Sequence, residues 1–257
     1  MVKRNCFFAY ASIAFLLLLS VSCRSTRLLE EGQMLVTKTE IVGVDPALEE
    51  QAYAYIPVDI RANSRINLFI YNLANAKKGR YRTEKIRNVG EPPHVLDSAL
   101  VDFSTQQINR YLRSNGYFNA SVRSEIVADG KRAHVVFHAT PGEPFTLRNV
   151  AVSIADSTLS EMYREGKGGV GKIRPGMRYD EDSLVVEREQ IYNLMRQTGY
   201  HDYLRQYMRV DVDTALQRNQ ADLKLIVDNP AGKTAHTQYF IDSSFIILRH
   251  DQPERNL

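Results

Sequence analysis

The chain has 257 residues, of which 44% are hydrophobic and 25% are charged, a composition typical of a globular protein with one or two domains. The net charge is +3, and without Lys3 and Arg4 of the N-terminal leader 31 basic residues stand against 30 acidic ones. Arginine is interleaved with acids, so the sequence lacks the clustered basic surface that indicates nucleic-acid binding. The two cysteines, Cys6 and Cys23, both lie near the N-terminus, which excludes a disulfide scaffold or a cysteine zinc site in the folded part.

Residues 1–22 are interpreted as a signal peptide. A short basic start precedes the apolar run Cys6–Leu19, which is shorter than the ~20 residues of a membrane-spanning helix. The small residues directly before Cys23 resemble a lipobox, although Ser20 stands where that pattern prefers an aliphatic residue. We therefore expect acylation of Cys23 and a polar tether over 23–33. The alternative is an ordinary cleaved signal peptide with an incidental cysteine.

The chain after the tether predicts a strand, a helix and then an unclear segment. Residues 34–44 alternate enough to predict a strand, and Asp45-Pro46 is typical of a helix N-cap followed by proline at the first helical position. That helix is expected to end at Pro57. Residues 57–93 are interpreted as an insertion; within it, Ser64–Ala76 fits either a helix or an extended segment.

The stretch from Phe103 to Leu147 predicts a helix followed by a β-hairpin. The helix stops at Gly116, because glycine adopts the left-handed C′ conformation without a Cβ clash. Asp129-Gly130 predicts a type I′ turn, in which both central residues have positive φ. The apolar face of the helix is expected to contain Phe103, Ile108, Tyr111 and Leu112.

The same pattern returns 83 residues later, where Gly199 repeats Gly116. The second helix face is expected to contain Val186, Ile191, Leu194 and Met195, and strands are predicted at 207–213 and 221–228, the latter central in its sheet and the former outermost. Such a repeat predicts tandem copies of one small domain. The fold class is therefore α+β, with tandem βααββ domains that each have a three-stranded mixed sheet and two helices on one face.

The expected domains follow from this repeat. The first covers 34–141 and includes the insertion 57–93, and the second covers 145–229. A third unit begins within 236–257, where a strand is predicted at Gln238–Leu248.

The helix that ends in Asn115-Gly116-Tyr117-Phe118, and the later Pro141–Phe145, resemble POTRA domains, the periplasmic modules of BamA/TamA-type outer-membrane assembly proteins. The lipobox-like start and three short motifs resemble more narrowly the Bacteroidota lipoprotein form, TamL; these motifs are Tyr71-Asn72, Gly90–Pro93 and Gly176–Tyr179 before Gly199-Tyr200. That family carries a C-terminal membrane β-barrel, for which the sequence up to Leu257 has no room. The expectation is a barrel-less fragment of a TamL-like protein.

The resemblance implies a non-enzymatic scaffold that binds a client or partner strand by β-augmentation. In the family the second strand of each unit is used, which here contains Ser121, Arg123, Glu125 and Val127 in the first unit and Tyr207, Arg209, Asp211 and Asp213 in the second. The alternative is that these charged residues only blunt an exposed edge.

The implied partners are the outer membrane, through lipidated Cys23, and either a β-barrel assembly partner or client outer-membrane proteins. No cofactor, metal, nucleic acid or small-molecule substrate is expected. In the family that the sequence resembles, an acidic run after the lipidated cysteine resembles a surface-export signal. Arg24–Arg27 contains no such run, so the resemblance implies a lipid-anchored protein that faces the periplasm. A free-standing lipoprotein adaptor that acts in trans is the alternative.

The loop Gly166–Lys172 matches the pattern GxxxxGK, so a P-loop NTPase is a remote alternative. Ile173 replaces the Ser or Thr that would hold Mg²⁺, and Pro175 follows where the helix should begin. His134 and His138 share one face of a predicted strand but are ~13 Å apart, too far to share a metal ion. We therefore expect no enzymatic activity.

Overall fold

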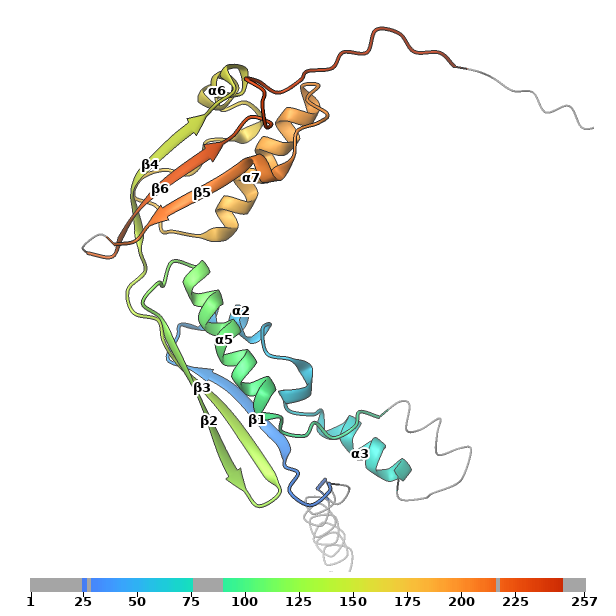
Figure 1. Cartoon of the computed structure of the whole chain (residues 1–257). Helices are drawn as coiled ribbons and strands as arrows, with labels where there is room; N and C mark the ends of the chain where they lie inside the picture. Colours follow the sequence, from blue (N-terminus) through green and yellow to red (C-terminus); the bar gives the residue numbers. More distant parts are fainter. Residues whose placement is uncertain (1–24, 27–28, 76–89, 216–217, 247–257) are drawn as a thin grey trace, which may run out of the picture. The chain divides into compact units, whose positions relative to one another are not determined.

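The computed structural model describes residues 25–26, 29–75, 90–215 and 218–246, so Cys23 lies outside the described residues. The chain divides into two compact units, unit 1 up to Pro144 and unit 2 from Phe145 (Figure 1). None of the helices that the structure describes combines the length and the apolar character required to cross a membrane.

Unit 1 contains a three-stranded mixed sheet with helices on one face. Its elements in chain order are β1 (Leu35–Val42), α2 (Pro46–Tyr53), α3 (Arg65–Asn75), α5 (Ser98–Ser114), β2 (Ser121–Asp129) and β3 (Arg132–Thr140). The strand order is β1-β3-β2, with β1 parallel and β2 antiparallel to the central β3. The core lies between the sheet and the helices α2 and α5, where Ile108, Leu112 and Phe137 are fully buried (Figure 1).

Unit 2 repeats this arrangement. It contains β4 (Thr146–Ile154), α6 (Ser157–Arg164), α7 (Glu181–Gln197), β5 (Met208–Asp213) and β6 (Gln220–Val227). Its strand order is β4-β6-β5, again with one parallel and one antiparallel pair. The expected α+β fold is therefore confirmed, as is the outermost position of the strand at 208–213 and the central position of β6.

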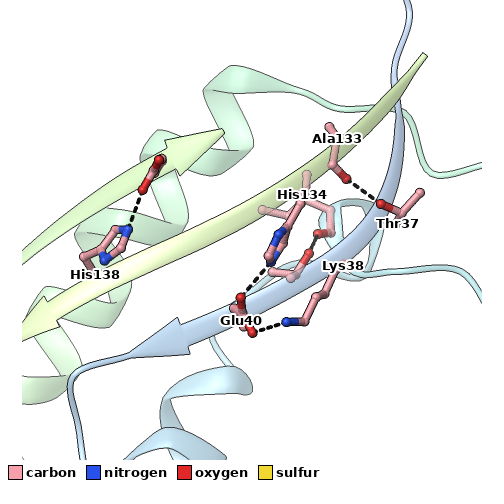
Figure 2. A network of polar contacts seen from close by, with 9 residues as sticks. Thr37, Lys38, Glu40, Ala133, His134 and His138 are labelled. Carbon is pink, nitrogen blue, oxygen red and sulfur yellow. Dashed lines mark hydrogen bonds and ion pairs between the residues drawn. The ribbon is translucent and has the colours of Figure 1, made fainter. Parts of the chain in front are cut away.

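The first strands of the two sheets share one irregularity. The pairing register of β1 shifts between Val36 and Lys38, and that of β4 shifts between Leu147 and Asn149. The hydroxyl of Thr37, at the first bulge, donates to the Ala133 carbonyl at 3.0 Å (Figure 2). Both sheets therefore carry a register shift at the same place, near the start of their first strand, where a bulge increases the local twist.

The long helices α5 and α7 have the same kinds of residue at their N-terminal and C-terminal caps. Asp97 and Asp180 are their N-caps, and each accepts hydrogen bonds from the backbone N–H groups of the first turn. Gly116 and Gly199 follow the helix ends with φ of 88° and 96°, so the prediction of positive φ at both glycines is confirmed. Local sequence therefore fixes both ends of each helix.

Two predicted core residues of these helices are exposed. Phe103 is 49% exposed and Val186 is 53% exposed. The next residue of each helix, Ser104 or Glu187, is buried instead. The prediction of Phe103 and Val186 on the buried faces was wrong because it assigned apolar residues to the interior and overlooked buried polar ones.

Two further local predictions differ from the structure. The loop between β2 and β3 consists of Gly130 and Lys131, and only Gly130, with φ of 56°, has positive φ. This is the pattern of a type II′ turn, not of type I′. The strand predicted at Gln238–Leu248 is absent from its described part, because residues 238–246 form no strand.

The segment after β6 is nevertheless attached to unit 2. The buried Asp156, which caps α6, accepts a hydrogen bond from the His236 backbone N–H at 2.9 Å. The His236 ring is buried against the rings of Tyr203 and Tyr207, at centroid distances of 5.0 and 5.1 Å. Tyr239 then donates its backbone N–H to a carbonyl at the end of α7. The chain is thus held on unit 2 up to Tyr239.

Candidate functional site

Each sheet has two outer strands, and later segments of the chain bond to the start of only one of them. In unit 1 the outer strands are β1 and β2, and in unit 2 they are β4 and β5. The starts of β1 and β4 are covered by later segments, through backbone bonds from Val36 to His94, Leu96 to Met34, Leu147 to Met177 and Tyr179 to Phe145. The described residues place no such segment against β2 or β5. These two antiparallel strands are therefore the candidate binding edges.

The backbone direction along β5 can be derived from one bond. Asp228 donates its backbone N–H to the Tyr207 carbonyl at 2.9 Å, which marks a hydrogen-bonded pair. Such pairs alternate along an antiparallel ladder, and the ladder of β5 and β6 runs without a register shift. The backbone groups of Val210 and Val212 therefore point away from β6. Met208 has the same direction, but its N–H is already bonded to the Arg205 carbonyl.

The same reasoning applies to β2. Asp129 and Arg132 flank a two-residue loop, and the residues that flank such a loop form a hydrogen-bonded pair. Alternation along the unshifted ladder then directs outward the backbone groups of Val122, Ser124, Ile126 and Ala128. The edge of β2 is thus longer than that of β5.

All the predicted site residues except Tyr207 lie on these strands, with their side chains on the open face of each sheet. Ser121, Arg123, Glu125 and Val127 alternate with Val122, which packs on the core, and Arg209, Asp211 and Asp213 occupy the matching positions of β5. Tyr207 lies in a short 3₁₀ turn just before β5. Their backbone groups point toward the central strand, so the outward groups belong to the residues between them. The length of the hairpin loop is the sequence signal that could have shown this.

The open face of unit 1 carries two cross-strand histidine–glutamate pairs (Figure 2). His134 Nε2 lies 2.8 Å from the Glu40 carboxylate, and His138 Nε2 lies 2.7 Å from that of Glu125. Lys38 is 2.5 Å from Glu40, and its hydrogen bond lowers the pKa of the Glu40 carboxyl. The two histidines thus face different partners, and the described residues contain no group of three acidic, histidine or cysteine side chains suited to bind a metal ion.

The open face of unit 2 carries arginine–aspartate pairs instead. Arg148 contacts Asp222 through two hydrogen bonds, and this guanidinium lowers the pKa of the Asp222 carboxyl. On the edge strand, Arg209 lies 3.1 Å from Asp228 and 3.4 Å from Asp211. These charges neutralise one another along the face, which leaves the outward backbone groups as the main feature of the edge.

Backbone N–H groups of the GxxxxGK loop are hydrogen-bonded to a side chain of the protein itself. Glu187 of α7 is only 1% exposed, and its carboxylate accepts the backbone N–H groups of Gly171 at 2.5 Å and Lys172 at 3.4 Å. Burial raises the pKa of the neighbouring Tyr163 phenol, and the Glu187 charge raises it further. A nucleotide-binding loop would offer such N–H groups to phosphate. Here an internal carboxylate uses them, which supports a structural role for this loop.

Comparison with known proteins links unit 1 to one domain family. Residues 70–142 match the model of the POTRA family, described as surface antigen variable number repeat. The match covers α5 and the β2–β3 hairpin, which contains the longer of the two candidate edges. No curated protein sequence matches the chain.

Several solved structures are similar at low identity. POTRA domains 3–5 of BamA from Haemophilus influenzae share 13% identity over 78% of this chain and 69% of that chain, with a TM-score of 0.41. BamA from Haemophilus ducreyi lacking POTRA domains 1–3 shares 12% identity over 76% of this chain and 29% of that one, with a TM-score of 0.40. POTRA domains 1–2 of Omp85 from Anabaena share 15% identity over 78% and 99% of the two chains, with a TM-score of 0.33.

Proposed function

We propose that this protein is a periplasmic scaffold for outer-membrane protein assembly, and that β2 and β5 each bind an extended strand of a client or partner protein. The observation that carries the proposal is the row of outward backbone groups on two tandem sheets, from Val122 to Ala128 in unit 1 and at Val210 and Val212 in unit 2. Added strands form main-chain hydrogen bonds, so such an edge tolerates varied client sequences.

Three features support this function. The POTRA match at 70–142 lies on the unit with the longer edge. The second unit repeats the same sheet order, which doubles the number of edges along one chain. The sequence before Cys23 resembles a lipobox, and acylation of Cys23, as in TamL, would attach the chain to the membrane where clients are assembled.

A pair of proline variants tests the edge of β5. Val210→Pro removes an N–H that points outward, whereas Asp211→Pro removes one directed at β6, so we expect only the second to weaken the ladder, by about 1–3 kcal/mol. A photocrosslinking amino acid at the exposed Arg209 reports strand binding in cells. Val210→Pro should fold and lose its crosslinks.

A proline in the central strand is the control for this experiment. Leu225→Pro should unfold unit 2, because β6 bonds to strands on both sides and Leu225 is 1% exposed. Undiminished crosslinks in folded Val210→Pro would contradict strand addition at β5. Unfolding of Val210→Pro as severe as that of Leu225→Pro would contradict the derived backbone direction.

The anchor is tested separately by metabolic labelling with a fatty acid. The wild-type chain and Cys6→Ala should incorporate the label, and Cys23→Ala should not. Label retained in Cys23→Ala would contradict the lipoprotein assignment while leaving the edge mechanism intact.

A further inference from the structure

Over the residues whose side chains the structure describes, 65–72, helix α3 packs on unit 1 through one face. Leu68 is buried in a small cluster with Leu29 and Leu35, against which Val95 also packs. This cluster is separate from the main core between the sheet and α2 and α5. It fixes α3 beside the first residues of β1 (Figure 1).

The segment Gly90–His94 clamps the same side of α3. Glu91 donates its backbone N–H to the Asn67 carbonyl at 3.2 Å, and its carboxylate accepts the N–H of Ser64 at the start of the helix. Gly90 approaches so closely that an added Cβ would lie 2.5 Å from the Tyr71 nitrogen. These contacts attach one side of α3 to the Gly90–His94 segment of unit 1.

The opposite face of α3 is apolar and open. Ile66 is 71% exposed and Phe69 is 43% exposed. At 3.6 residues per turn, these two side chains are about 160° and 100° around the axis from Leu68. Ile70, half-buried, extends the same face, and the i, i+3, i+4 spacing of the three is that of an amphipathic helix. The hydrophobic face that a soluble helix normally buries is therefore turned outward here.

The position and charge of α3 indicate what covers this face. Leu29, which packs beside the helix, is six residues after Cys23, and six residues span at most about 20 Å. Arg65 is the only charged residue of α3, and the sequence after the helix, from Lys77 to Arg87, is rich in lysine and arginine. Anionic lipid headgroups attract basic segments of this kind.

We propose that α3 lies in the headgroup region of a phospholipid membrane, with Ile66 and Phe69 inserted among the acyl chains. This inference rests on the proposed attachment of the chain at Cys23. The helix would be a second, weaker contact that orients unit 1 against the membrane, since a single lipid attachment leaves a domain free to rotate.

The absence of tryptophan from the whole sequence permits a direct test. Phe69→Trp and Phe103→Trp each create a single fluorophore at a phenylalanine of similar exposure, 43% and 49%, on helices of the same unit. The full-length lipidated chain is reconstituted into vesicles of phosphatidylethanolamine and phosphatidylglycerol, with and without brominated acyl chains. Phe69→Trp should shift its emission to shorter wavelength and be quenched roughly twofold by bromine, as for an interfacial helix. Phe103→Trp should show neither effect.

The outcomes separate this inference from the anchor. Vesicles that float with the chain while Phe69→Trp remains as unquenched as Phe103→Trp would overturn insertion of α3 alone. A chain that does not float would overturn both the anchor and the inference that rests on it. Ile66→Asp in the Phe69→Trp background provides a second variant, and it should abolish the quenching without loss of flotation.

Discussion

The two units have the same arrangement of strands and long helix, but their long helices bury different residues at the same position. In α5 this residue is Ser104, which is fully buried and donates its hydroxyl to the Leu100 carbonyl of its own helix at 2.7 Å. In α7 it is Glu187, whose carboxylate leaves the helix to accept the N–H groups of Gly171 and Lys172. The neighbouring structure explains this difference.

Helix α5 packs on another helix, whereas α7 also supports a loop. The main core of unit 1 joins α5 to α2, and Tyr111 donates its hydroxyl to Gln51 of α2 at 2.6 Å. The backbone N–H and C=O groups of a helix are hydrogen-bonded within the helix, so the position of Ser104 needs no side chain that accepts N–H groups from a neighbour. The loop Gly166–Ile173 has N–H groups that need an acceptor once buried. A buried carboxylate is therefore required in unit 2 and not in unit 1.

The largest expected effect comes from removal of this carboxylate. Glu187→Ala leaves two N–H groups without an acceptor and a cavity, so unit 2 should lose about 3 kcal/mol of unfolding free energy. Ser104→Ala removes only a bond within the helix and should change unit 1 by less than about 0.5 kcal/mol. Native-state hydrogen exchange reports each unit separately. Equal losses from the two variants would contradict the proposed difference.

The glycines after the two helices sharpen the comparison. Both have positive φ, so alanine at Gly116 should cost about 1 kcal/mol. At Gly199 an added Cβ would also lie 2.6 Å from the Tyr239 carbonyl oxygen. Gly199→Ala should therefore cost about 2 kcal/mol or more and expose residues near Tyr239 to exchange. A smaller loss of unfolding free energy in Gly199→Ala than in Gly116→Ala would show that the Tyr239 carbonyl moves away from the added Cβ without a free-energy cost.

The smallest expected effect is a pH dependence confined to unit 2. Burial lowers the pKa of His236 below 6.5, and the nearby Asp156 only partly opposes this shift. The unfolded chain then binds a proton more readily than the folded one, so this contribution is present above pH 6.5 and is lost as pH falls toward the folded-state pKa. Exchange near His236 should accelerate below pH 6.5.

His236→Phe keeps a ring between Tyr203 and Tyr207 but cannot be protonated. This variant should lose the acceleration that sets in as pH falls below 6.5. The carboxyl of Asp156 does not explain that window: burial raises its pKa, but hydrogen bonds from the N–H groups of His236 and Leu159 outweigh this and lower it, so its own contribution is lost only at more acidic pH. An unchanged pH profile in His236→Phe would assign the effect elsewhere.

Local signals in the sequence were enough to predict the strands of both sheets, the long helices α5 and α7, and their order. The cap Asp45, the glycines after both long helices and the apolar run of β6 each depend on a few adjacent residues. The central position of β6 was predicted from its nearly continuous apolar sequence, and the structure confirms it. These features could be predicted because each residue type has a single local physical reason to stand at its position.

The remaining features depend on contacts between distant segments. Nothing near Glu187 in the sequence indicates that it binds Gly171, and nothing near Ser64 indicates that Glu91 caps α3. The sequence therefore left α3 undecided between a helix and an extended segment. The predicted site residues of β2 and β5 differ from the outward ones for another reason: they share a side-chain face, whereas the backbone groups that point outward belong to the residues between them.

The attachment of the segment at His236–Tyr239 has a mechanical consequence. A force applied to the chain beyond Tyr239 would first load the hydrogen bond from the Tyr239 N–H to the Gly199 carbonyl. It would then load the bond between His236 and Asp156 at the start of α6. The load would therefore pass to the ends of two helices before it reached β6. Under tension, these two contacts of unit 2 would have to break one after the other. Only then would the load reach the central strand β6.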